Sequence, residues 1–192
     1  MTDKRKTKKV KVERNIYEHG YLGSIASNQL IQAKAEEDGH RFRWIIPSMA
    51  FSVFRVEALC NIYGGQLFPH WTHFESTSFI GKIAMISEFL NVDVDFSLEP
   101  WQTLNNMKRF RNALAHAKPQ KVSVVHVVPE SRPERLMPFP QDKKTIMSYS
   151  SIENAERFKE VATELEMMWM HGAQVSGHLV DTVGAPTYET ID

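Results

Sequence analysis

The segment from about Trp44 to Tyr63 places its apolar side chains at the period of an α-helix. They recur every three or four positions, at Ile45, Met49, Val53, Val56, Cys60 and Tyr63. A stripe of this kind is stable in water only when other elements cover it. Pro47 lies where the first turn of a helix tolerates proline, and Gly64-Gly65 predicts the end of the helix. We therefore expect the hydrophobic core to form around this segment.

Four further segments carry helical periodicity. The expected helices cover about Ile16–Glu37, about Glu75–Leu90, Pro100 to the residue before Pro119, and about Ile152–His171. In the first of them the expected apolar stripe is Tyr17, Tyr21, Ile25, Ile31 and Ala35. Prolines bracket the third, at positions that permit a start and force a stop. Ser150 and Glu153 form a capping box before the last. The predicted fold class is all-α, a helical bundle.

The pattern changes between the last two of these helices. Lys121–Val128 is short and rich in β-branched residues, which predicts a strand. Lys144–Tyr149 predicts a return strand, so that residues of about 121–149 would form a small β-hairpin with a proline-rich loop. The bundle would then carry this hairpin insertion before its last long helix. Residues 15–171 are predicted to be one domain, and residues 172–192 a C-terminal tail without clear periodicity.

Length and composition narrow the class of protein. A chain of 192 residues with 42% hydrophobic and 24% charged residues is typical of a single globular domain. One cysteine, Cys60, argues against a disulfide framework and against a Cys-based metal site. The apolar runs are shorter than a membrane span needs, and no apolar stretch follows the basic N-terminus as in a secretory signal. We expect a cytoplasmic protein with no membrane partner.

The formal net charge of zero conceals an asymmetry along the chain. Residues 1–14 hold seven Lys and Arg against two acidic residues, so this arm carries +5 and the rest of the chain −5. Clustered cations bind polyanions because they displace phosphate counterions. Charged termini are also often flexible and merely solvated. The sequence leaves both interpretations of the arm open.

One motif in the predicted fourth helix points to chemistry. Within MKRFRNALAHAKP (residues 107–119), Arg111, Asn112 and His116 are spaced R-N-x-x-x-H. This resembles the HEPN superfamily, whose ribonuclease members carry Arg, four to six residues and then His, often with Asn directly after the Arg. The layout of residues 44–119 is also similar: an apolar helix, a second helix, and a helix that begins at a proline and ends in the motif.

The resemblance implies a HEPN-like bundle and a metal-independent endoribonuclease with no cofactor. Catalysis would use Arg111, Asn112 and His116, because histidine can act as acid or base near neutrality and arginine can neutralise a phosphorane. Lys108, Arg109 and Lys118 would contact RNA. The family pairs two protomers around one cleft and leaves a 2′,3′-cyclic phosphate. Toxins and antiviral defence effectors are the expected roles, with an antitoxin or regulatory protein as a further partner.

A non-catalytic HEPN-like module for dimerisation or for nucleotide and RNA sensing is the alternative. In a subset of the family a Tyr stands two residues after the His and is modified by a nucleotidyltransferase antitoxin. Here that position is Lys118, so this form of control is not predicted. His70 and His73 lack acidic or Cys neighbours and are not predicted to bind metal.

Helical geometry separates the motif residues. At about 100° per residue, Asn112 and His116 share a face, whereas Arg111 lies about 140° from His116. Leu104, Met107, Phe110 and Leu114 are expected to face the core. Three explanations for Arg111 are open: a distorted helix end, a site shared with a partner protomer, or an ion pair with a carboxylate such as Glu57.

Overall fold

The computed structural model describes residues 8–117, 121, 123–131, 133, 137 and 146–191. Its helices are α1 (His19–Ala35), α2 (Phe42–Leu67), α3 (Phe79–Phe89), α4 (Trp101–Ala115) and α5 (Ile152–Val175). Short 3₁₀ turns occur at η1 (Asp38–His40), η2 (Trp71–His73) and η4 (Ile146–Tyr149). Two strands, β1 (Lys9–Glu13) and β2 (Thr187–Ile191), complete the described elements. The mostly helical fold agrees with the all-α prediction.

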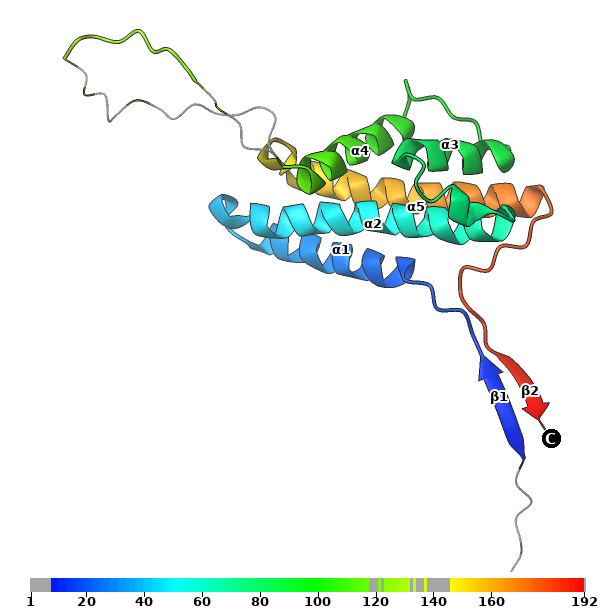
Figure 1. The fold of residues 1–192 in the computed structure, drawn as a ribbon. Coiled ribbons are helices and arrows are strands. Elements are labelled where there is room, and N and C mark those ends of the chain that lie inside the picture. Colours follow the sequence, from blue (N-terminus) through cyan, green and yellow to red (C-terminus); the bar gives the residue numbers. More distant parts are fainter. Residues whose placement is uncertain are drawn as a thin grey trace, which may run out of the picture.

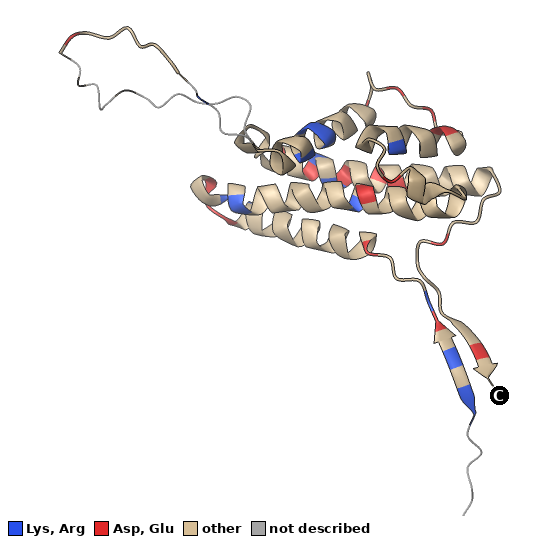
Figure 2. Ribbon diagram, in the orientation of Figure 1, with Lys and Arg blue, Asp and Glu red and all other residues tan. Residues whose placement is uncertain are grey.

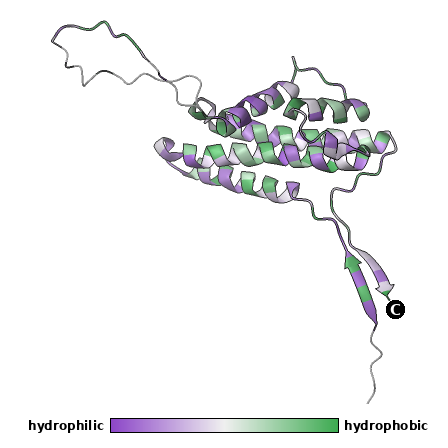
Figure 3. Ribbon diagram, viewed as in Figure 1, coloured by the Kyte–Doolittle hydropathy of each residue, from purple (hydrophilic) through white to green (hydrophobic). Residues whose placement is uncertain are grey.

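Helix α2 is the centre of the bundle. It packs against α1 on one side, against α5, and against α3 and α4 on the other side (Figure 1). The apolar stripe predicted from the sequence is confirmed, because all of its members are buried: Ile45, Met49, Val53, Val56, Cys60 and Tyr63. Hydrophobic and hydrophilic residues alternate in bands along the helices (Figure 3), as amphipathic helices require.

The predicted end of this helix at Gly64-Gly65 is wrong. Helix α2 continues to Leu67, and the Phe68 N–H caps it by donating to the Gly64 carbonyl at 2.9 Å. Gly64 is needed for packing instead, since a Cβ at this position would collide with the Trp71 ring. A glycine that permits close contact inside a helix looks the same in sequence as one that terminates it.

The buried face of α1 also differs from the prediction. Its buried apolar residues are Ala26, Leu30 and Ala33, while Tyr21 and Ile31 are exposed. The small residues allow α1 to lie close to α2, where the buried Ser48 hydroxyl donates to the Ala26 carbonyl at 2.8 Å. Close packing of backbones, rather than hydropathy alone, selects this face.

Helix α5 confirms the helix predicted at about Ile152–His171, and it buries Phe158, Val161, Leu165 and Trp169 at helical spacing. The Trp169 indole N–H donates to the buried Ser87 hydroxyl of α3 at 2.8 Å, which satisfies both polar groups inside the core. The cap lies one residue later than predicted. Ser151, not Ser150, accepts the hydrogen bond from the Asn154 N–H, at 3.1 Å.

The β-hairpin predicted at about 121–149 does not form among the described residues there. Residues 121 and 123–128 have no strand structure, and Ile146–Tyr149 is a 3₁₀ turn. The sheet lies at the chain ends instead, where β1 pairs antiparallel with β2, Lys9 opposite Ile191 and Glu13 opposite Thr187. Part of the basic arm and part of the C-terminal tail are therefore a two-stranded ribbon that projects from the bundle (Figure 1).

Asp181 and Gln66 attach this ribbon to the bundle. The Gln66 amide exchanges two hydrogen bonds with the Asp181 backbone, both at 2.8 Å. Hydrogen bonds from the Gly184 and Val183 N–H groups lower the pKa of the Asp181 carboxyl. Gly184 has a φ of +71°, and a Cβ there would collide with the Asn15 carbonyl.

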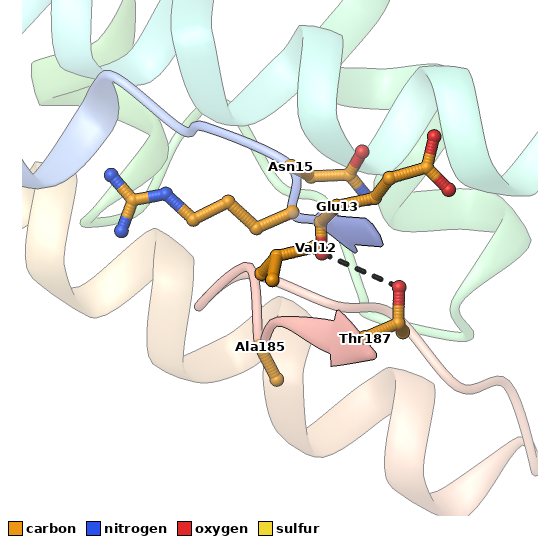
Figure 4. Close-up of a pocket in the computed structure, with 6 residues that line it drawn as sticks. Val12, Glu13, Asn15, Ala185 and Thr187 are labelled. Atoms are coloured by element: carbon orange, nitrogen blue, oxygen red, sulfur yellow. Dashed lines mark hydrogen bonds between the residues drawn. The ribbon is translucent and has the colours of Figure 1, made fainter. Parts of the chain in front are cut away.

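Beside this attachment an open cavity of about 650 Å³ is lined by Val12, Glu13, Arg14, Asn15, Ala185 and Thr187 (Figure 4).

By length and composition α2 would also suffice to cross a bilayer, because an 18-residue window has a mean hydropathy of 1.4. Among the described residues it is the one helix with this property. Half of that window is buried inside the bundle. Core helices of globular proteins meet the same criterion, and the buried stripe contributes to the hydropathy of α2.

Candidate functional site

Helix α4 carries the predicted motif and is fixed by its core face. Leu104, Met107 and Phe110 are fully buried, as predicted, and Leu114 is partly buried against the core. The Phe110 ring makes an edge contact with Phe158 of α5, at 5.7 Å between ring centroids. This packing determines which sides of α4 face α2 and the solvent, and so sets the direction of each motif residue.

Arg111 lies on the side of α4 that faces α2. Its Nε is 3.2 Å from Oε1 of Glu57, and the two side chains are 41% and 29% exposed. One of the three explanations for Arg111, an ion pair with Glu57, is therefore confirmed. The contact uses Nε, and neither terminal nitrogen of Arg111 bonds to another described residue. The guanidinium is held in place but keeps donors for a further ligand.

Asn112 and His116 lie on the solvent side, where both residues are exposed. The His116 N–H donates to the Asn112 carbonyl at 3.0 Å, which closes the last turn of α4. His116 itself has left helical geometry, with φ −122° and ψ 35°. The motif thus presents an amide and an imidazole one turn apart at the open end of a helix.

The regular helix leaves Arg111 away from that face. Helix α4 is α-helical from Trp101 to Ala115, so a distortion before His116 does not bring Arg111 round to Asn112 and His116. Two of the three explanations remain: Arg111 belongs to the ion pair with Glu57, or it acts together with a partner protomer. The two are compatible, because Glu57 engages only one edge of the guanidinium.

The electrostatics of α4 favour an anion. The helix contains Lys108, Arg109 and Arg111 and no acidic residue (Figure 2). Lys108 is half-buried, Arg109 is exposed, and neither forms an ion pair with another described residue. Lys118, the third predicted RNA contact, lies outside the described residues. Among the described residues, Glu57 is the one acidic side chain that forms an ion pair with a residue of α4, while Glu99 accepts hydrogen bonds from Thr103 in its first turn.

Cys60 and the metal-ligating side chains of the described residues offer no further reactive group at this site. Burial raises the pKa of the Cys60 thiol to about 12, so it stays protonated at neutral pH and is a poor nucleophile. Within the described part of the chain, His, Cys, Asp and Glu side chains form no group of three or more that could hold a metal ion.

Sequence reasoning missed one aromatic side chain near the ion pair. Phe54 lies outside the apolar stripe of α2, three residues before Glu57, and is 41% exposed. The signal was available, since a phenylalanine off the buried stripe of an amphipathic helix must face another surface or solvent.

Comparisons with known proteins add no assignment. No family model, no curated protein and no solved structure matches this chain.

Proposed function

We propose that this protein is a metal-independent endoribonuclease of the HEPN type that acts as a homodimer. The observation that carries the proposal is the end of α4: Asn112 and His116 are exposed one turn apart, and Arg111, on the α2 side of the same helix, is held through Nε by Glu57 and has no other ion pair among the described residues. These residue types supply a proton-transfer group and a phosphate ligand, which are what RNA cleavage by the neighbouring hydroxyl requires.

In the proposed reaction the 2′-oxygen of a ribose attacks the adjacent phosphorus and the bond to the 5′-oxygen breaks. The products are a 2′,3′-cyclic phosphate and a 5′-hydroxyl end. Imidazole takes up and releases protons near neutral pH, so one His116 removes the 2′-hydroxyl proton and a second protonates the leaving oxygen. Arg111 binds the non-bridging oxygens through the nitrogens that its ion pair leaves free.

The homodimer follows from the number of groups in this reaction. One chain brings a single His116 and a single Arg111, fewer than a separate acid, base and charge stabiliser require. Two chains with both motifs at one cleft supply two of each. Such a site also accommodates the offset between Arg111 and His116 on α4, since each arginine can serve the partner's histidine. A toxin or antiviral effector controlled by an antitoxin or regulatory protein is the corresponding cellular role.

His116→Ala tests this proposal. Cleavage of a single-stranded RNA should disappear, while the wild-type protein should continue to cleave in EDTA and leave cyclic phosphate ends. The measurement is product analysis by mass spectrometry, with the melting temperature recorded for each variant. An RNA with a single 2′-deoxy sugar at the cleaved position should resist the wild-type enzyme at that position.

His171→Ala is the matched control, because His171 is also an exposed histidine near the C-terminal end of a helix, α5. It should cleave like the wild type. Activity that is lost in EDTA and restored by magnesium, or a His116→Ala variant as active as the His171→Ala variant, would contradict the proposed mechanism.

A non-catalytic HEPN-like module is the second candidate, and the Arg111–Glu57 ion pair is the observation that favours it. The pair compensates the charge of Arg111 within its own chain, as for a structural arginine. A wild-type protein that binds RNA or dimerises, but leaves the 2′-hydroxyl substrate intact, would favour this candidate over the enzyme.

A further inference from the structure

Phe51 and Phe54 form an aromatic pair on a side of α2 that the core does not use. Their ring planes are nearly perpendicular, at 88°, with 6.1 Å between centroids. Phe51 is half-buried, whereas Phe54 is 41% exposed. The Phe51 ring thus supports one side of the Phe54 ring, and much of the rest faces solvent. Because the Phe51 ring already limits the motion of the Phe54 ring, a ligand that stacks on Phe54 costs little further side-chain entropy.

The ion pair with Arg111 locates this ring relative to the motif. Glu57 follows Phe54 by three residues, so the two side chains lie on one side of α2, with Cβ atoms roughly 5–6 Å apart. Glu57 contacts Arg111, and α2 and α4 run in opposite directions (Figure 1). A residue three positions before Glu57 on α2 is therefore at the height of a residue about three positions after Arg111 on α4. Phe54 therefore lies level with the last turn of α4, which ends at Ala115, directly before His116.

We propose that Phe54 is a stacking platform for a nucleobase of single-stranded RNA, next to the phosphate that Arg111 binds. This inference rests on the proposed function and specifies its substrate class. An aromatic ring beside a cationic stretch is how proteins hold single strands, because bases stack on the ring while phosphates meet the cations. A base paired within an RNA duplex cannot reach such a ring.

Charge favours RNA over a second copy of the chain as the occupant of this surface. Lys108, Arg109 and Arg111 lie on the neighbouring helix, α4 contains no acidic residue, and the ion pair with Glu57 offsets one of these three charges. Packing the same surface of another copy directly onto Phe54 would bring like charges together, which opposes association. A polyanion matches this charge, and in the homodimer it would fill the cleft between the two cationic helices.

The test uses an RNA that the protein cannot cut. A single-stranded oligonucleotide with 2′-O-methyl groups throughout lacks the attacking hydroxyl, so binding is measured separately from catalysis. Fluorescence anisotropy should show Phe54→Ala weakening binding between about fivefold and a hundredfold, the range for one lost base stack. Phe54→Trp should retain affinity, and Phe54→Leu should lose it although it keeps most of the apolar volume.

Phe42→Ala is the matched control, since Phe42 is a similarly exposed phenylalanine, at 44%, at the first residue of the same helix, twelve residues before Phe54. It should bind like the wild type. Replacing the bases of the oligonucleotide by abasic sites should remove the difference between the wild type and Phe54→Ala. The duplex form of the same oligonucleotide should bind both proteins equally.

The outcomes separate this inference from the proposed function. Equal RNA affinity of the wild type and Phe54→Ala would overturn the stacking role, even if His116-dependent cleavage is present. Loss of self-association in Phe54→Ala, seen by sedimentation, with unchanged RNA affinity would assign the surface to the dimer interface and also overturn it. Phe54-dependent binding in a protein that cleaves no RNA would support the stacking role and refute the enzyme.

Discussion

Two of the arginine–glutamate pairs that join α2 to its neighbours, Arg55–Glu166 and Arg111–Glu57, differ in depth and in their number of contacts. Arg55 Nη2 lies 2.6 Å from Oε2 of Glu166 on α5, with the side chains 15% and 23% exposed. Arg55 Nη1 also donates to the Thr163 hydroxyl at 2.9 Å. Among the described residues Arg111 makes one ion pair, with Glu57 at 3.2 Å, and it is far more open to solvent.

Arg55 is a structural arginine, whereas Arg111 is accessible to a ligand. The Arg55 side chain passes over Gly23 of α1 before it reaches α5, so it ties three helices together. His19 of α1 adds a second contact to Glu166, 3.2 Å from Nε2 to Oε1. A guanidinium enclosed in this way has few donors left for a ligand. Arg111 is oriented by one carboxylate but remains accessible, which is the arrangement a phosphate ligand needs.

Arg55→Ala should cause the largest loss of stability. The substitution leaves the Glu166 carboxylate mostly buried and short of one charged partner, and breaking a buried pair in this way costs about 3–5 kcal/mol. Thermal unfolding followed by circular dichroism should show a decrease in melting temperature on the order of 10 °C. A melting temperature equal to that of the wild type would refute the distinction between the two pairs.

Arg111→Ala should instead affect activity far more than stability. A partly exposed ion pair contributes up to about 1 kcal/mol, so the melting temperature should change by only a few degrees. Cleavage should fall about 10²-fold or more, the scale for one lost donor to the transition state. Arg111→Lys should recover part of that loss, because lysine keeps the charge without the planar fork. Melting curves and single-turnover cleavage rates measure both effects.

The opposite result would change the assignment of the site. If Arg111→Ala lowers the melting temperature as much as Arg55→Ala does, both pairs are structural. Catalysis would then have to be ascribed to His116 without an arginine from its own helix.

Spacing of apolar residues was sufficient to predict the helices of the bundle but not all of their faces and ends. The stripes on α2 and α4 were predicted correctly because each buries large side chains at helical spacing. The face of α1 was predicted wrongly, since its contact with α2 depends on Ala26 and Ala33 while Ile31 remains outside. Hydropathy does not distinguish a small residue chosen for close approach from a neutral one.

The sheet could not be placed from local sequence. Alternating Lys and Val over Lys9–Glu13 is a strand signal, but its partner Thr187–Ile191 lies at the other end of the chain. The β-branched run Lys121–Val128 is a stronger local signal, yet its described residues have no strand structure. Strand formation depends on a partner and a register, and neither is encoded within a single short segment.

The candidate site was predictable to the extent that it follows from one helix. The 140° offset separated Arg111 from Asn112 and His116, and Glu57 was named as a carboxylate that could pair with Arg111, one of three explanations left open. What no single helix could reveal is the alignment between helices. The level of Phe54 relative to His116 depends on how α2 and α4 pass one another, and the ion pair fixes it only in the folded chain.

Glu57→Gln should have the smallest effect and probes why Arg111 is available. Glutamine can still accept a hydrogen bond from Nε but no longer compensates the charge of Arg111. Stability should fall by about 0–1 kcal/mol, as for other exposed pairs. Because the uncompensated guanidinium attracts RNA more strongly, KM should fall by up to about fivefold. At the same time kcat should fall several-fold, because the arginine is oriented less firmly for the transition state.

A carboxylate that only stabilises the fold would leave kcat and KM unchanged, so steady-state kinetics on one RNA substrate distinguish the two roles. Unchanged kcat and KM, with a lower melting temperature, would make Glu57 a structural residue and remove the positioning role from the site.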